Sequence, residues 1–201
     1  MWRQILPGLR IKIFMTVLLG VIYPLVITGI SQAIFPRQAN GSLIRQGEKV
    51  IGSELIGQSF TKPEYFRGRP SNAGANGYDA TASGGFNQGP TNKKLIDRVT
   101  AAVEQFKKDN PDYTGPIPAD LVTGSASGLD PHLSPDSARA QAARVAKARG
   151  VSLEQVTELI GQFTENPDLG FLGEPRVNVL RLNLALDQRF PKRALAERNG
   201  Q

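Results

Sequence analysis

The sequence contains no cysteine and a single histidine, His132. The lack of cysteine excludes disulfide bonds, thiolate metal sites, a cysteine nucleophile and iron–sulfur clusters. The single imidazole excludes any site in this chain that requires two. Aromatic residues make up 7% of the chain and are not interleaved with basic clusters, and this pattern argues against nucleic acid as a partner.

Acidic residues are missing from the first part of the chain, so the net charge of +6 is unevenly distributed. Residues 1–12 and 188–201 each contribute +3, whereas residues 37–187 hold 17 basic and 17 acidic residues. The body of the chain therefore offers no excess of positive charge to a polyanion.

No charged residue occurs between Ile13 and Pro36. As a helix, the 23 residues of Ile13–Phe35 would rise about 34 Å, enough to cross a bilayer core of about 30 Å. The alternative is a cleaved signal peptide, for which Ser31-Gln32-Ala33 resembles a cleavage site. The apolar run exceeds the usual signal core of about 7–15 residues, so we predict an uncleaved anchor.

The charges that flank this span predict its orientation. Arg3, Arg10 and Lys12 precede it, whereas only Arg37 and Arg45 follow closely. This bias favours a cytoplasmic N-terminus and a main domain outside. One face of the helix carries small or weakly polar residues that would let another membrane helix approach closely. These residues are Thr16, Gly20, Pro24, Thr28 and Ser31.

We predict the fold class as α+β, with a single N-terminal transmembrane helix followed by one extracytoplasmic mixed α/β domain. The expected parts are a cytoplasmic segment (1–12), the transmembrane helix (13–35), the soluble domain (36–190) and a flexible basic tail (191–201).

Residues 42–44 and 49–51 are predicted to be short strands around a turn at Gln46-Gly47. Residues 68–90 form a long loop rich in glycine, and loops of this length are usually functional or disordered.

Three helices are expected after this loop. The first covers 91–110, the second begins after Ser134 and ends at Gly150, and the third begins with a Ser152–Gln155 capping box and ends near Asn166-Pro167. Residues 175–188 are ambiguous: alternating leucines favour a strand, whereas the polar spacing and Pro175 favour a helix, which we prefer.

No catalytic motif is recognisable in this chain. The segment Gly124–Gly128 resembles a nucleophile elbow, but its central residue is Ala126 rather than serine. No acidic cluster has the spacing of a metal-binding loop, so neither catalytic nor metal-ligating residues are predicted. An alternative function is a membrane-anchored periplasmic hydrolase or binding module built around His132.

The chain resembles the C subunit of the bacterial Kdp potassium-transporting ATPase over nearly its whole length. A departure from the family pattern is Gly124, where a second alanine is expected. The matching segments are the membrane span, Gln38–Ile44, Ile56–Phe60, Tyr65–Ser71, Pro118–Pro131, Arg144–Ala146, Pro175–Leu180 and Asn183–Asp187.

The resemblance implies an accessory subunit of an ATP-driven potassium import complex in the bacterial inner membrane. Its expected partners are a pore-forming potassium-binding subunit, a P-type ATPase subunit, a small single-span subunit and the lipid bilayer. It implies a role in assembly and as a catalytic chaperone that promotes ATP binding by the ATPase subunit. The chain itself is expected to bind no cofactor, and K⁺ is the ion that the complex transports.

The resemblance also suggests site residues. Gln58, in the Gly57-Gln58-Ser59 motif, is a candidate nucleotide contact, although a domain outside the membrane would meet no ATP. The loop 68–90 is expected to contact the pore subunit. Candidate subunit contacts are Tyr65, Phe66, Arg67, Arg69, Asp120, Ser127 and Asp130.

Overall fold

The computed structural model describes residues 2–191, so all but the first residue of the predicted tail (191–201) lies outside the described residues. The chain divides into two compact units whose boundary lies between Ser53 and Glu54. Residues 36–53 belong to the same compact unit as the apolar helix.

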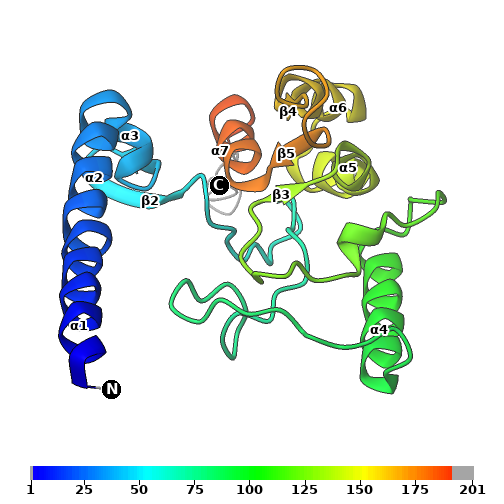
Figure 1. Cartoon of the computed structure of the whole chain (residues 1–201). Helices are drawn as coiled ribbons and strands as arrows, with labels where there is room; N and C mark the ends of the chain where they lie inside the picture. The colour runs from blue at the N-terminus through cyan, green and yellow to red at the C-terminus, as the bar shows by residue number, and fades with distance from the viewer. Residues whose placement is uncertain (1, 192–201) are drawn as a thin grey trace. The chain divides into compact units, whose positions relative to one another are not determined.

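The first unit is dominated by one long apolar helix, built from α1 (Trp2–Val17), a π-helical turn (Leu18–Ile22) and α2 (Tyr23–Ile34) (Figure 1). Within Arg3–Ile34 the most apolar 18-residue window has a mean hydropathy of 2.3, and none of this window is buried within the chain. The predicted apolar helix is confirmed and begins about ten residues earlier than expected. A helix with this much exposed apolar surface needs lipid or another protein to cover it.

Pro24 explains the π-helical turn. Proline has no backbone N–H to donate, and the N–H of Tyr23 bonds the carbonyl of Leu18, five residues earlier. In an α-helix, the three four-residue steps from Thr16 to Thr28 would drift by about 120° around the axis. The π turn holds one additional residue and removes roughly 100° of that drift. It therefore keeps Thr16, Gly20, Pro24 and Thr28 on one face.

A short helix and a β-hairpin complete the first unit. The helix α3 (Pro36–Ala39) precedes β1 (Leu43–Gln46) and β2 (Lys49–Ser53), which pair antiparallel with a bulge between Ile44 and Arg45. Gly47 has a φ of +63° in the turn. The two predicted strands are confirmed.

The second unit packs three helices around a small antiparallel sheet, so the α+β class is confirmed. The strand order is β3 (His132–Leu133), β5 (Arg176–Asn178) and β4 (Thr164–Glu165). In Figure 1 these strands run between α7 (Val179–Arg189) and the pair α5 (Pro135–Arg149) and α6 (Leu153–Gln162). The fully buried core side chains include Phe66, Val145, Val156, Leu159, Ile160, Val177 and Leu186.

The predicted helix ends of α5 and α6 are confirmed. The Ser134 side chain accepts from the N–H of Ser137 at 3.1 Å, and Gly150 adopts φ +66° after the last turn of α5. Ser152 and Gln155 form the reciprocal capping box of α6. Local side-chain chemistry is therefore enough to place these boundaries.

Two predictions near the C-terminal end need correction. The segment 175–188 is neither all helix nor all strand, because β5 covers Arg176–Asn178 and the Asn178 side chain then caps α7 by accepting from the N–H of Arg181 at 3.1 Å. The preceding helix ends at Gln162, not near Asn166, since residues 164–165 leave it to pair with β5 as β4.

The helix α4 (Lys93–Asp109) lies apart from α5–α7 in Figure 1 and is linked to them by long irregular segments. Its extent agrees with the predicted helix at 91–110, and Asn92 caps it. Among its apolar residues only Phe106 is buried; Leu95, Val99 and Val103 are half-buried. A short 3₁₀ helix (Ala119–Leu121) interrupts the second irregular segment.

Candidate functional site

Two irregular segments, 54–92 and 110–131, cross each other and form the surface that lies between α4 and the core. Three backbone carbonyls of the second segment accept from the first. The N–H of Gly57 bonds Leu129 O at 2.8 Å, the N–H of Gly84 bonds Ser127 O at 2.8 Å, and the Ser71 hydroxyl bonds Gly128 O at 2.5 Å. The loop 68–90 is thus held by specific bonds, although it contains no helix or strand.

Two side-chain amides secure the start of this region to the core. The Asn183 amide bonds both the N–H and the C=O of Phe66, each at 2.9 Å. The Gln141 amide does the same for Arg67, at 2.9 and 3.1 Å. Each amide supplies one donor and one acceptor, so the pair replaces the neighbouring strand that this segment lacks.

Arg144 joins these segments to α5. Its guanidinium donates to the Asn110 side chain at 3.0 Å, to Tyr65 O at 3.0 Å and to the Gln141 side chain at 2.8 Å. Burial, together with the nearby charge of Arg67, lowers the pKa of Arg144 to about 10, and Asp109 partly offsets this effect. Arg144 stays charged at neutral pH, and its donors are used within the chain.

Arg69, Asp130 and Tyr78 form a second polar cluster. Arg69 Nη1 lies 3.1 Å from Asp130 Oδ2, and the Tyr78 hydroxyl donates to Arg69 O at 2.5 Å. Burial alone would raise the pKa of Asp130, but hydrogen bonds from His132 and the charge of Arg69 outweigh it and hold that pKa below its usual range. Burial and the charge of Asp130 raise the pKa of Tyr78 to about 12.

The structure places the seven candidate subunit contacts in different environments. Phe66 is fully buried in the core, so its side chain is not available at the surface. Asp120 accepts from Ser134 N at 2.8 Å and from the Ser137 hydroxyl, which anchors the start of α5. Arg67 pairs with Asp109, and the Tyr65 hydroxyl donates to Asp187 at 2.9 Å. Ser127 is exposed.

Gln58 follows a glycine that is packed tightly into the domain. A Cβ atom on Gly57 would lie 2.6 Å from both Asp130 O and the Tyr78 ring, so this position admits only glycine. The Gln58 side chain is half-buried. Gly57 therefore has a structural role in this motif that requires no nucleotide.

The residues around His132 are used to build turns. The Ser125 hydroxyl accepts from the N–H of Gly128 at 2.9 Å, and the Ser127 hydroxyl from the N–H of Leu129 at 3.1 Å. His132 itself lies in β3, with Nδ1 3.6 Å from Asp130 Oδ1. Within residues 2–191 no group of three or more His, Asp and Glu side chains is arranged to hold a metal ion.

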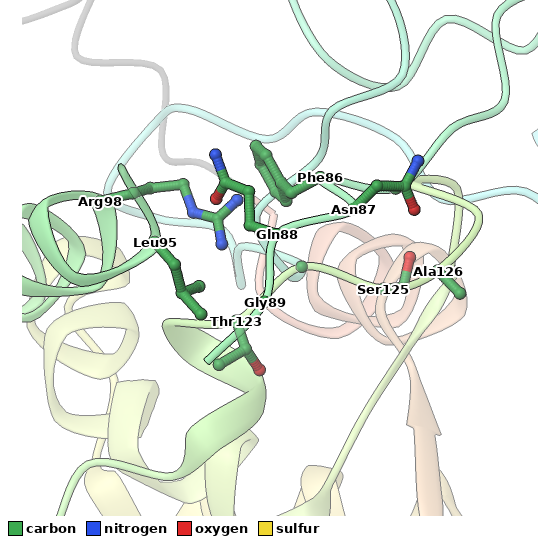
Figure 2. Close-up of a pocket in the computed structure, with 11 residues that line it drawn as sticks. Phe86, Asn87, Gln88, Gly89, Leu95, Arg98, Thr123, Ser125 and Ala126 are labelled. Carbon is green, nitrogen blue, oxygen red and sulfur yellow. The ribbon is translucent and has the colours of Figure 1, made fainter. Parts of the chain in front are cut away.

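A cavity of about 580 Å³ opens between the Gly-rich loop, the start of α4 and the segment 123–126 (Figure 2). No sequence pattern predicts this cavity, because its lining comes from three separate segments. The lining residues are Gly85, Phe86, Asn87, Gln88, Gly89, Leu95, Arg98, Thr123, Gly124, Ser125 and Ala126.

Glycines shape the walls of this cavity. A Cβ atom on Gly85 would lie 2.7 Å from Ala126 O, and one on Gly124 would lie 2.5 Å from the Phe86 ring. The Phe86 ring thus occupies the space that an alanine methyl group at position 124 would need, so glycine fits this position in this chain.

Comparison with known proteins shows extensive similarity. A family model described as K⁺-transporting ATPase, c chain, matches residues 5–188. The potassium-transporting ATPase KdpC subunit of Myxococcus xanthus is 56% identical over 191 residues, which cover 94% of this chain and 90% of the relative. Subunits of the same name from Rhodospirillum rubrum and Caulobacter vibrioides are 56% and 57% identical and cover 95% of this chain and 98% and 96% of their own lengths. The chain therefore belongs to the family of KdpC subunits of potassium-transporting ATPases.

Proposed function

We propose that this chain is a non-catalytic accessory subunit of a potassium import complex, anchored by its apolar helix with the main domain outside the cytoplasm. It stabilises the pore-forming and P-type ATPase subunits and the small single-span subunit of the same complex. The observation that carries the proposal is the helix Arg3–Ile34, which is apolar and unburied within a chain of this family. Bilayer lipid and a partner helix together would cover that surface.

The packing face of the helix is the small-residue stripe Thr16, Gly20, Pro24, Thr28 and Ser31. The π turn keeps most of these residues in line, which supports this assignment. A side chain at Gly20 would meet only the Thr16 methyl group, at 3.9 Å, and one at Gly29 would meet nothing within 4 Å. Leucine at either position is therefore compatible with the isolated helix.

Gly20 lies on the stripe and Gly29 lies off it, so the two glycines give a matched test of assembly. Gly20→Leu should reduce the amount of the chain that copurifies with the pore subunit after detergent solubilisation, whereas Gly29→Leu, which lies off the stripe, should not. Equal copurification of both variants with the wild type would refute the proposed packing face.

The proposed chaperone effect is an allosteric coupling, in which binding of this chain raises the affinity of the ATPase subunit for ATP. It needs no nucleotide on this chain. Removal of the chain from the complex should raise the KM for ATP in K⁺-stimulated hydrolysis, and the intact complex is the reference. An unchanged KM would leave only the assembly role.

The orientation decides whether Gln58 can act on nucleotide. With residues 54–191 outside, Gln58 meets no ATP; a direct contact requires the opposite topology. Protease added to intact spheroplasts should digest the main domain and spare a cytoplasmic marker protein. Protection of the domain would overturn the proposed orientation and restore Gln58 as a nucleotide contact.

The loop 68–90 is the proposed contact with the pore subunit. Deleting it would remove Tyr78, which packs against Gly57 and Gly68, and would test folding rather than contact. Substitution of exposed residues such as Asn76 and Ala80 by glutamate tests the contact without that loss. Reduced K⁺-stimulated ATPase activity of a folded variant supports the contact, and full activity contradicts it.

The alternative, a membrane-anchored hydrolase or binding module, has less support, because the neighbouring serine hydroxyls serve turns and His132 does not line the cavity of Figure 2. His132→Ala would discriminate: complex activity should be unchanged for an accessory subunit.

A further inference from the structure

The cavity of Figure 2 contains one charged side chain, Arg98, which extends from α4 toward Phe86 and Gln88 of the loop. Its guanidinium carbon lies 3.4 Å from the centre of the Phe86 ring. This stacking covers one face of the guanidinium and fixes its plane, so the N–H groups at its edge remain for hydrogen bonding. The remaining lining residues carry no charge.

The donors of Arg98 are enclosed but unused within residues 2–191. Its Nε and Nη1 atoms each expose less than 1 Å² and have no hydrogen-bond partner in that part of the chain, and the same is true of Gln88 Oε1. Arg98 also forms no ion pair there, unlike Arg67 and Arg69. Burial lowers the pKa of Arg98, as expected for a cation that lacks a counter-ion. Enclosed donors and acceptors without partners are costly, so a ligand that pairs with them gains a matching stabilisation.

The unpaired groups define the chemistry of such a ligand. A guanidinium edge matches the two oxygens of a carboxylate, and its single charge balances one carboxylate rather than a doubly charged phosphate. Gln88 Oε1 needs a donor, such as a backbone N–H. The Ser125 hydroxyl at the opposite wall accepts from Gly128 N and lies 3.5 Å from the Ser127 hydroxyl. A peptide segment with an acidic side chain presents both a carboxylate and a backbone N–H.

We propose that this cavity receives an acidic side chain, carried on an exposed peptide segment of another subunit of the transport complex. The carboxylate pairs with the guanidinium of Arg98, and a backbone N–H of the same segment donates to Gln88. This inference rests on the proposed function, since it requires that the chain work within a complex. The volume of about 580 Å³ accommodates a side chain with its adjoining backbone.

The test is site-specific photo-crosslinking in the assembled, detergent-solubilised complex. Asn87 lines the cavity and is exposed, so a photoreactive amino acid at this position leaves Arg98 and Gln88 intact. We expect a crosslink to another subunit, mapped by mass spectrometry to a segment that contains Asp or Glu. Arg98→Gln should lower its yield about tenfold or more, because truncating one partner of an enclosed charged pair costs at least that factor. Arg98→Lys should lower the yield less.

Lys94→Gln is the matched control. It removes the same charge from an exposed residue of the same helix, one turn earlier, and should leave the yield unchanged. Thermal unfolding of each variant shows whether the domain remains folded. Because Arg98→Gln could loosen the loop, Arg98→Lys, which keeps the charge, provides the second variant.

Several outcomes would overturn the proposal: no intersubunit crosslink from position 87, a crosslink to a segment without acidic residues, or equal losses in Arg98→Gln and Lys94→Gln. A crosslink that disappears with 100 mM acetate in both the wild type and Lys94→Gln, but not in Arg98→Gln, supports carboxylate recognition.

Copurification separates failure of this proposal from failure of the proposed function. If the wild-type chain does not copurify with the other subunits, the proposed function fails. If it copurifies without the crosslink, only the docking site fails.

Discussion

Phe86 and Gly124 form a complementary pair at the crossing of two irregular segments. A methyl group at position 124 would lie 2.5 and 2.6 Å from two atoms of the Phe86 ring and 3.1 Å from Pro70 O. Because the crossing is close-packed, added volume must displace the ring.

We expect Gly124→Ala to lower the free energy of unfolding by about 1–3 kcal/mol. In a Phe86→Ala background the same change should cost little, since the ring is gone. Denaturant unfolding of the two single variants and the double variant measures this coupling. If the losses of unfolding free energy in the two single variants add up to that of the double variant, the Phe86 ring does not restrict the size of the residue at position 124.

Tyr78 gives the domain a pH dependence at high pH. Its pKa is raised from 10.0 to about 12 in the folded chain by burial and the charge of Asp130. The neutral hydroxyl is therefore favoured by folding, and this stabilisation is complete below pH 10 and is lost as the pH rises toward 12. The shift corresponds to roughly 2–3 kcal/mol.

Unfolding free energies measured between pH 9 and 12 should fall more steeply for the wild type than for Tyr78→Phe. The phenylalanine variant also loses the hydrogen bond to Arg69 O, so its stability at pH 7 should be lower by about 1 kcal/mol. If the unfolding free energies of the wild type and Tyr78→Phe fall in parallel with pH, titratable groups other than Tyr78 cause the loss of stability.

At the scale of whole elements, α5 depends on an anchor distant in sequence. Asp120 accepts from the N–H of Ser134 and from the hydroxyls of Ser134 and Ser137, all at the first turn of α5. A carboxylate at this position also interacts favourably with the positive end of the helix dipole.

Asp120→Ala should therefore destabilise the domain by about 2–3 kcal/mol, because the half-buried Ser134 and the fully buried Ser137 lose a charged acceptor. Asp136→Ala is the control: it removes an exposed acid of the same helix turn, whose ion-pair partner among residues 2–191 is Arg139, and should cost less than about 1 kcal/mol. Thermal unfolding compares the two, and similar losses would contradict the anchoring role of Asp120.

The elements also show how far sequence patterns extend. Ser134, Gly150 and the Ser152–Gln155 box predict helix ends correctly because capping is local. The segment 175–188 misleads because α7 is buried on most sides, which places leucines at nearly every turn and hides the helical period. The β3–β5–β4 sheet uses strands of two or three residues, too short for a period-two pattern, and only tertiary pairing defines it.

The candidate site was predictable only in part. The family motif Pro118–Pro131 marks one of its segments, and the glycine-rich loop marks the other. Their crossing, the amide bonds of Gln141 and Asn183, and the cavity around Arg98 join residues up to 117 positions apart. No local spacing carries that information.

At the scale of the whole molecule, the hydrophobic core lies entirely in the second unit. All the residues of its buried cluster, and those packed against it, lie between Phe60 and Phe190. The apolar helix contributes nothing to this core, so its loss leaves the buried cluster complete.

A fragment that begins at Glu54 should therefore fold cooperatively and stay monodisperse without detergent, whereas the full chain should require detergent. Circular dichroism on heating and size-exclusion chromatography check this expectation. A fragment with no sharp unfolding transition would show that residues 36–53 are required for folding.

The contact between Phe86 and Gly124 has a consequence for protein engineering within this family. Hybrid genes that take the loop from one relative and the segment 118–131 from another would separate two residues that must be chosen together. A bulky ring inherited with an alanine would meet a steric conflict, and a small residue inherited with a glycine would leave an empty space. Recombination breakpoints should therefore avoid residues 86–124, or the two positions should be exchanged as one unit.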